Sequence, residues 1–263
     1  MKRILLLIYQ ILIWLPCFLA ATVLTAITCT VGCLLGGERI FSYYPGMLWS
    51  RFACWISLCP VKIIKKGKLD RKQSYIFVGN HQGVYDIFLL YGYLGFPIKW
   101  IMKKSLRKIP LVGKACESAG FIFVDNSSPI AAAKTIKDAE KRLKNGASIT
   151  LFPEGSRTYT GQLGKFKKGA YQMALDMRLP IVPVSINGSF EVMPRTSIWL
   201  HPHPLEVVIH DPIPTENLVS NDLRSVAETI RSLIEQSRAV IESGLWERYN
   251  SNEAHPIVTE KQT

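Results

Sequence analysis

The stretch that decides the fold spans residues 75–86 and reads Tyr75-Ile76-Phe77-Val78-Gly79-Asn80-His81-Gln82-Gly83-Val84-Tyr85-Asp86. It begins with a short apolar run, residues 75–78, of the kind that forms a buried β-strand. The first polar side chains appear where this strand would end, which is the edge at which open α/β sheets bind ligands. The stretch therefore predicts a strand that ends at a ligand-binding site.

His81 and Asp86 are the candidate catalytic pair in this stretch. A histidine can take up and return a proton near neutral pH, and a carboxylate can orient the ring and stabilise its charged form. On one α-helix, residues five apart would point about 140° away from each other. Pairing therefore requires His81 in a turn and Asp86 on the following helix, which Gly83 permits. A loop histidine is more often structural, so the pair needs support from elsewhere in the chain.

A second chemical centre is the loop Phe-Pro-Glu-Gly-Ser-Arg-Thr at residues 152–158, which follows another strand-like run. The guanidinium of Arg157 is a planar fork of donors that matches a phosphate, and Ser156 and loop amides can add bonds. Lys167 lies just beyond, where the next helix begins and its positive dipole end favours an anion. Either this loop is a surface turn with an ion pair, or it shares a site with His81; we favour the shared site.

The rest of the chain alternates strand-like and helix-like runs. Strands are expected at residues 99–102, 121–124, 148–151 and 179–184, and helices at residues 86–93, 114–118, 128–144 and 223–241. Apolar residues of the last strand have two interpretations, an acyl channel or ordinary strand packing, and we favour packing. Strands that alternate with helices of about 10 to 15 residues predict an α/β domain whose mostly parallel sheet is flanked by helices.

The N-terminal residues 4–36 carry no charge and form an apolar run too long for a secretory signal. As one helix they would measure about 50 Å, against about 30 Å for a bilayer core. Pro16 is the natural break, so we expect a membrane-seated hairpin of two helices in preference to a single span, and least of all a buried core helix. Positive residues flank both ends of the run, as expected for a hairpin that returns to the cytoplasmic face.

Residues 40–56 are rich in aromatic side chains and have two interpretations, a helix in the headgroup zone of a membrane or one packed on the domain. The lysines that follow, at residues 62–68, would attract anionic lipid or form a solvated face. We expect a membrane anchor and interfacial helix at residues 1–60, a catalytic domain at residues 61–249 and a polar tail at residues 250–263.

Composition points to an anionic partner. The 263 residues are 48% hydrophobic and carry a net charge of +12, which suits a membrane surface, a nucleic acid or a phosphorylated substrate. The six cysteines show no C-x-x-C spacing, so free thiols are expected, most of them buried. His201, His203 and His210 lack further ligands, so they are expected to be loop histidines and no metal site is expected.

The chain resembles the glycerolipid acyltransferases typified by 1-acylglycerol-3-phosphate O-acyltransferase. Four motifs of that family match in order over residues 74–190. They are His-x4-Asp at His81 and Asp86 with the preceding Asn80, the block at residues 120–126, Phe-Pro-Glu-Gly-x-Arg at residues 152–157 with the downstream Phe166, Lys167 and Gly169, and the proline-containing block at residues 180–184. The second block departs from the family, because Asn126 replaces the usual arginine.

The resemblance implies transfer of an acyl group from acyl-CoA or acyl-carrier protein to lysophosphatidic acid, giving phosphatidic acid. His81 would be the general base, and Asp86 would hold its ring. The residues expected to bind substrate are Asn80, Glu154, Gly155, Ser156, Arg157 and Lys167. Membrane lipids are the expected partners, with the catalytic domain on the cytoplasmic face, no nucleic acid, and no cofactor besides the acyl donor.

Asn126 leaves the acceptor headgroup open, so a different lysolipid or an aminolipid is the alternative acceptor. A membrane-anchored hydrolase of thioesters or esters is a further alternative, although the sequence contains no recognisable nucleophile motif. A lipid-binding module without catalysis is the third.

Overall fold

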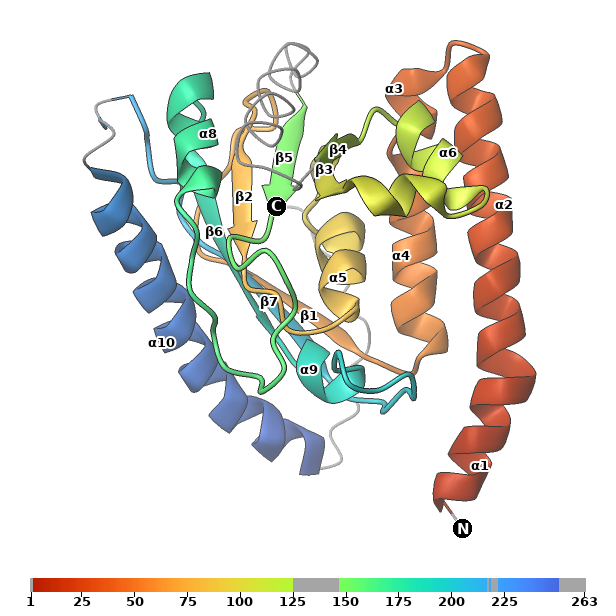
Figure 1. Cartoon of the computed structure of the whole chain (residues 1–263). Coiled ribbons are helices and arrows are strands. Elements are labelled where there is room, and N and C mark those ends of the chain that lie inside the picture. Colours follow the sequence, from red (N-terminus) through yellow and green to blue (C-terminus); the bar gives the residue numbers. More distant parts are fainter. Residues whose placement is uncertain (1, 125–146, 217, 219–221, 251–263) are drawn as a thin grey trace.

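The computed structural model describes residues 2–124, 147–216, 218 and 222–250 (Figure 1). Asn126, the helix expected at residues 128–144 and the tail from residue 251 onward lie outside the described residues.

The described residues build one seven-stranded sheet in the order β1-β7-β6-β2-β5-β3-β4. Its strands are β1 (Val61–Lys65), β2 (Ile76–Gly79), β3 (Ile98–Lys103), β4 (Ile122–Val124), β5 (Ser148–Leu151), β6 (Ile181–Asn187) and β7 (Leu205–Ile209). Neighbouring strands are parallel except β6 and β7, which are antiparallel. The predicted α/β class with a mostly parallel sheet is confirmed. Strands β1 and β7 were not predicted; lysines interrupt the apolar run of the first, and Glu206 interrupts that of the second.

The register of the central strands sets the position of the site. Strand β2 is fully buried and lies between β5 and β6, and Val78 is paired with Leu151 of β5. Because the two strands are parallel, the loops that follow them begin at the same edge of the sheet. His81 and Glu154 each follow that pair by three residues, so both loops start level.

Helices cover both faces of the sheet (Figure 1). Helices α4 (Tyr44–Ile56), α5 (Tyr85–Tyr93) and α6 (Val112–Ser118) lie on one side, and α8 (Gly169–Met177) and α10 (Leu223–Asn250) lie on the other. Alternation along the strands divides the core: Phe77 and Val182 belong to the first cluster, and Ile76 and Ile181 to the second. The side chains of residues 181–184 are thus used for packing, as favoured from the sequence.

The N-terminal helix corrects the hairpin that we expected at Pro16. Helix α1 (Lys2–Tyr9), a π-helical turn (Gln10–Trp14) and α2 (Leu15–Leu34) form one continuous helix. The N–H of Leu15 donates to the carbonyl of Gln10, five residues back. This wider turn accommodates Pro16, whose ring would otherwise collide with the preceding turn of an α-helix. By length and composition the helix is long and apolar enough to cross a membrane, and little of it is buried.

The chain reverses direction after Leu34 instead. Gly36 takes a positive φ of 87°, short helix α3 (Glu38–Phe41) follows, and α4 then packs beside α2. One face of α4 packs on α5, where the Trp49 and Phe88 rings lie 5.0 Å apart. Its other face leaves Leu48 and Trp55 exposed. The interpretation of residues 40–56 as a helix packed on the domain is therefore confirmed for that first face.

All six cysteines are free, and Cys29, Cys54 and Cys59 are buried. Cys17 is exposed on α2, which differs from the burial expected for most of them.

Candidate active site

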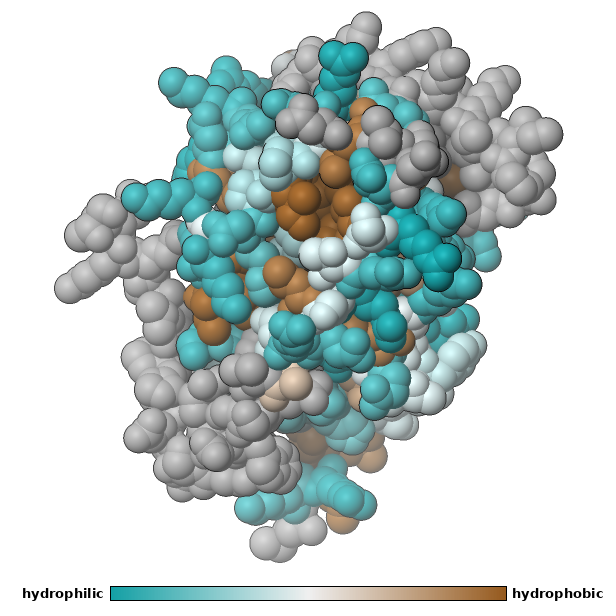
Figure 2. All heavy atoms as spheres, turned by 90° about the vertical axis from the view of Figure 1, so that its left-hand side faces the viewer, coloured by the Kyte–Doolittle hydropathy of each residue, from teal (hydrophilic) through white to brown (hydrophobic). Residues whose placement is uncertain are grey.

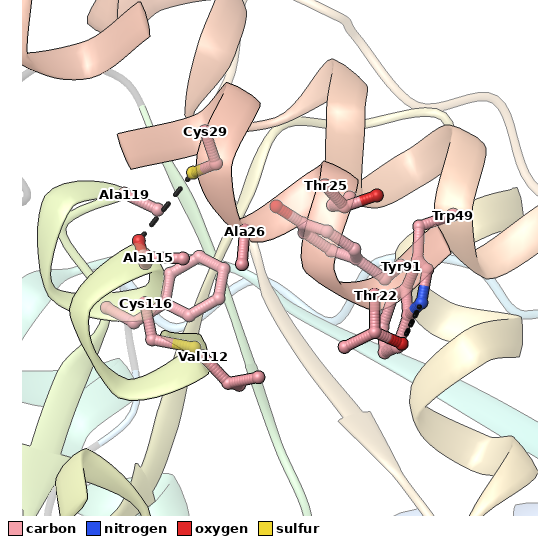
Figure 3. Close-up of a pocket in the computed structure, with 12 residues that line it drawn as sticks. Thr22, Thr25, Ala26, Cys29, Trp49, Tyr91, Val112, Ala115, Cys116 and Ala119 are labelled. Atoms are coloured by element: carbon pink, nitrogen blue, oxygen red, sulfur yellow. Dashed lines mark hydrogen bonds between the residues drawn. The ribbon is translucent and has the colours of Figure 1, made fainter. Parts of the chain in front are cut away.

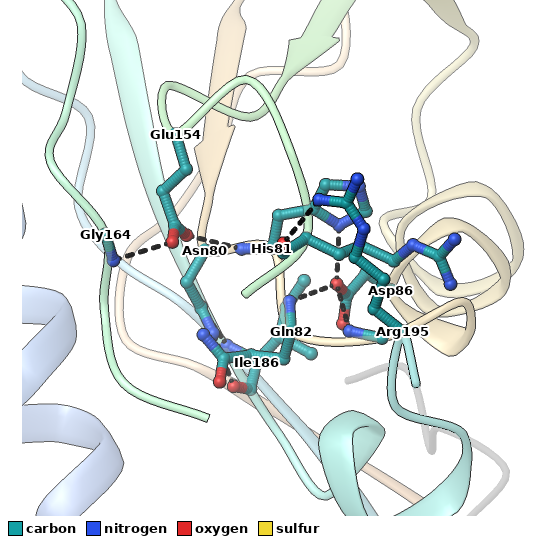
Figure 4. A network of polar contacts seen from close by, with 10 residues as sticks. Asn80, His81, Gln82, Asp86, Glu154, Gly164, Ile186 and Arg195 are labelled. Atoms are coloured by element: carbon teal, nitrogen blue, oxygen red, sulfur yellow. Dashed lines mark hydrogen bonds and ion pairs between the residues drawn. The ribbon is translucent and has the colours of Figure 1, made fainter. Parts of the chain in front are cut away.

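The His81–Asp86 pair forms as its spacing requires. His81 lies in the loop after β2, Asp86 lies in the first turn of α5, and His81 Nδ1 is 2.7 Å from Asp86 Oδ2 (Figure 4). The backbone N–H groups of Gln82 and Gly83 donate to the same oxygen over 2.6 and 3.0 Å. A Cβ at Gly83 would lie 2.2 Å from the Ser189 carbonyl oxygen, so only glycine fits this turn.

These contacts determine which ring nitrogen of His81 is available for chemistry. The Asp86 carboxylate is fully buried and accepts hydrogen bonds, so the neutral ring carries its hydrogen on Nδ1. Nε2 is then an acceptor, and within the described part of the chain no group hydrogen-bonds to it. The His81 side chain is 14% exposed, which gives a substrate access to this atom.

The loop at residues 152–158 contacts His81 on three sides. The Phe152 ring stacks on the imidazole with 3.9 Å between ring centroids. The N–H of His81 donates to Glu154 Oε1 over 2.7 Å, and its carbonyl accepts the N–H of Thr158 over 3.0 Å. The prediction that both loops share one site is confirmed by these contacts.

Glu154 connects the His81 loop with the loop that contains Gly164. Its second oxygen accepts the N–H of Gly164 over 2.7 Å, so the buried carboxylate joins two loops through backbone donors (Figure 4). Burial raises the pKa of Glu154, while the two backbone hydrogen bonds and His81 act in the opposite direction. These contacts give Glu154 a positioning role for the His81 loop, and its substrate contact stays a prediction.

Asn80 likewise has a structural role. It is fully buried, its amide nitrogen donates to the Ile186 carbonyl, and its amide oxygen accepts the Ile186 N–H, both over 2.8 Å. The side chain thus extends the pairing of β2 and β6 beyond the last residue of β2. A contact between Asn80 and substrate stays a prediction.

The remaining predicted substrate-binding residues line the outer side of the same loop. Gly155 has a positive φ of 75°, and a Cβ there would lie 2.8 Å from Lys167 Nζ. Ser156 and Lys167 are exposed and Arg157 is half-buried. Two cationic side chains therefore flank the loop that contacts His81, and their contact with substrate stays a prediction.

Arg195 was missed by the sequence analysis. It follows α9 (Ser189–Val192), and its Nη1 donates to the carbonyl of Arg157 over 3.4 Å. Its guanidinium also lies 4.4 Å from the ring centroid of Tyr159. The available signal was that its loop follows β6, which is parallel to β2 and ends at the same edge of the sheet.

An apolar cavity of about 90 Å³ lies between α2, α4, α5 and α6 (Figure 3). Tyr91 and Phe121 are among its walls, and ring contacts from Tyr91 to Trp100 and from Trp100 to Phe152 connect it with His81. The volume is smaller than the roughly 150 Å³ cavity that admits benzene. In this conformation the cavity does not hold a long acyl chain.

No group of three or more potential metal-ligating side chains occurs among the described residues. His210 lies in the loop that follows β7, as expected, and its ring is buried and hydrogen-bonds to Ser185.

Sequence comparisons show the family to which the chain belongs. A model of the Acyltransferase family matches residues 60–187. The 1-acyl-sn-glycerol-3-phosphate acyltransferase of Saccharomyces cerevisiae is 32% identical over 213 residues, which are 80% of this chain and 69% of the yeast protein. The chain belongs to this acyltransferase family.

Other members and a solved structure show the same relation. A chloroplastic 1-acyl-sn-glycerol-3-phosphate acyltransferase of Arabidopsis thaliana is 32% identical over 201 residues, which are 73% of this chain and 55% of the plant protein. The crystal structure of the 1-acyl-sn-glycerophosphate acyltransferase from Thermotoga maritima superposes with a TM-score of 0.75 at 23% identity, covering 90% of this chain and 97% of that one. This match confirms the fold.

Proposed function

We propose that this protein transfers a fatty acyl group from a thioester, acyl-CoA or acyl-carrier protein, to the free hydroxyl of 1-acyl-glycerol-3-phosphate. The product is phosphatidic acid. The observation that carries the proposal is the buried Asp86 carboxylate on His81 Nδ1, which leaves Nε2 as a proton acceptor at the ligand-binding edge of the sheet. The names of the related proteins support the same acceptor.

His81 acts as a general base and then as a general acid. Nε2 takes the proton of the acceptor hydroxyl while that oxygen bonds to the thioester carbonyl carbon. Asp86 stabilises the imidazolium that forms. When the tetrahedral intermediate collapses, the carbon–sulfur bond breaks and the imidazolium returns its proton to the leaving thiolate. No covalent bond to the enzyme is needed, and the dyad ends in its starting state.

The cationic side chains beside the dyad orient the acceptor. Arg157 and Lys167 flank the Glu154–Gly155 turn, and a guanidinium can hold two phosphate oxygens at once. Fixing the phosphate would place the hydroxyl at His81, which turns encounter with the acyl donor into an oriented reaction.

The N-terminal helix suggests association with a membrane, where the acceptor and product reside. We place the catalytic domain on the cytoplasmic face, where the acyl donors are found, with membrane lipids as partners. A site seated at the surface would take lipid substrates without extracting them fully from the bilayer.

The test compares wild type with His81→Ala in detergent, using labelled acyl-CoA and, separately, acyl-carrier protein, with and without lysophosphatidic acid. We expect phosphatidic acid that depends on the acceptor, and a loss of about 10²- to 10⁴-fold in kcat for the variant. His201→Ala is the matched control, because His201 is exposed and lies outside the dyad. Free fatty acid released without acceptor would overturn the proposal in favour of a thioesterase. Turnover only with other lysolipids would overturn the choice of acceptor.

A further inference from the structure

Two arginines from distant parts of the chain meet beside His81 without an acidic partner. Arg195 donates to the carbonyl of Arg157, so its guanidinium lies against the backbone of the second arginine. No carboxylate in the described ranges forms an ion pair with either side chain. Each guanidinium keeps its positive charge without a carboxylate partner in the segments that the structure describes, so this part of the surface would attract an anion.

Both arginines flank the loop that carries the dyad. Thr158, which follows Arg157, donates its N–H to the His81 carbonyl, and Val84 donates its N–H to the carbonyl of Met193 over 3.5 Å. Arg195 is two residues beyond Met193. Figure 4 shows the Arg195 side chain rising past Asp86 toward His81.

Tyr159 holds the Arg195 side chain in a defined orientation. The guanidinium lies over the phenol ring at 4.4 Å from its centroid, a cation–π contact that fixes the plane of the fork. Stacking uses the face of a guanidinium and leaves its edges for hydrogen bonds. Only one of its five N–H donors is engaged by Arg157, so the others can bind the oxygens of an anion.

We propose that Arg195, together with Arg157, binds the phosphate of the lipid acceptor and selects acceptors that carry one. This inference rests on the proposed function. In 1-acyl-glycerol-3-phosphate the reacting hydroxyl and the phosphate ester oxygen sit on adjacent carbons. A hydroxyl placed at His81 Nε2 therefore brings the phosphate within about one side-chain length of the ring, on the side where the loops that carry the two arginines contact residues 81–84. The phosphates of an acyl donor are separated from the thioester by the much longer pantetheine arm.

The experiment measures KM for lysophosphatidic acid and for acyl-CoA, and kcat, with full-length wild type, Arg195→Ala and Arg195→Lys in detergent. We expect the acceptor KM to rise about 10- to 100-fold in Arg195→Ala, as for loss of a charge-assisted hydrogen-bonding group, while the donor KM changes less than twofold. The lysine variant keeps the charge but loses the fork, so its acceptor KM should be intermediate. Glycerol 3-phosphate should inhibit wild type competitively with the acceptor and inhibit Arg195→Ala more weakly.

Arg224→Ala is the matched control, because Arg224 is an exposed arginine of α10 that pairs with Glu228, away from the His81 loop. Thermal unfolding of each variant shows whether it is folded, and a folded lysine variant keeps the test decisive if the alanine variant is not. An unchanged acceptor KM in the arginine variants would overturn the inference and leave the proposed function intact. A rise in the donor KM alone would assign Arg195 to the donor phosphates and overturn it as well. Wild type that fails to acylate lysophosphatidic acid would instead overturn the proposed function together with this inference.

Discussion

Asn80 and Glu154, which lie next to the predicted catalytic pair, both form hydrogen bonds with backbone groups. Both are buried, and both pair with main-chain groups of other segments. Asn80 replaces the missing strand partner of Ile186, and Glu154 holds the His81 N–H. An unpaired buried backbone group costs free energy, so these hydrogen bonds stabilise the position of the His81 loop.

Replacing Asn80 by Ala should destabilise the protein without changing substrate affinity. The Ile186 N–H and carbonyl would lose their partner in a site that is closed to solvent, so the free energy of unfolding should fall by about 1–3 kcal/mol. We expect kcat to fall because the His81 loop loosens, with the acceptor KM unchanged. Chemical denaturation and steady-state kinetics measure these quantities.

Ser156→Ala serves as the control, because Ser156 is exposed on the neighbouring loop and should change stability by less than about 0.5 kcal/mol. A higher acceptor KM in Asn80→Ala with normal stability would instead support the substrate contact that the sequence predicted.

At the level of elements, the antiparallel pair β6–β7 places polar side chains under α10. Ser185 Oγ is 2.8 Å from His210 Nε2, and Asn187 Oδ1 accepts a hydrogen bond from Arg238 of α10. A groove of about 640 Å³ runs between α10 and the outer strands next to His210. The helix thus packs on a face that combines apolar residues with paired polar groups.

His210 should make this packing sensitive to acid. Burial, and the nearby Lys66 ammonium, lower the pKa of His210 to about 4 from its usual 6.5, and Asp211 opposes the shift only in part. The unfolded chain therefore binds the proton more readily, so stability is greatest above pH 6.5 and falls as the pH drops toward 4. The contribution is roughly 3 kcal/mol at most. Urea denaturation at pH 7 and pH 5 should show a smaller loss for His210→Gln than for wild type. An equal loss in both proteins would contradict the assignment.

At the scale of the whole molecule, hydrophilic and apolar surfaces are segregated. The side formed by α8 and α10 is mainly hydrophilic with a few hydrophobic patches (Figure 2). The long helix of α1 and α2 lies on the opposite side of the molecule and exposes a continuous series of leucines and isoleucines (Figure 1). Exposed apolar surface of this extent marks a contact with a membrane or a partner, and the net charge of +12 favours anionic lipid.

Lysines introduced on this helix should release the protein from vesicles. Leu12 and Leu24 are 69% and 67% exposed, and each Leu→Lys change costs about 3 kcal/mol in the centre of a bilayer. We expect the Leu12→Lys, Leu24→Lys double variant to float with phosphatidylcholine vesicles at least tenfold less than wild type. Ser232→Lys adds charge on exposed α10 and should float normally. Equal flotation of all three proteins would show that the helix does not insert.

The sequence by itself determined the strands that end at the site and the geometry of its catalytic pair. Apolar runs predicted β2 and β5, and the spacing of His81 and Asp86 allowed pairing only across a turn and a helix start. These features depend on residues that are close together in the sequence, so the order of residues is enough to predict them. The helix expected at residues 128–144 and the position of Asn126 lie outside the described residues.

Only the tertiary structure decided which distant groups the predicted site residues pair with. Asn80 finds its partner 106 residues away at Ile186, and Arg195 meets Arg157 across 38 residues. The continuous helix through Pro16 depends on a π-helical turn, and Gln10 of that turn exchanges hydrogen bonds with the backbone of Leu200, 190 residues further on. Local propensity does not predict such pairings, because they stabilise the protein only after packing has brought the distant segments together.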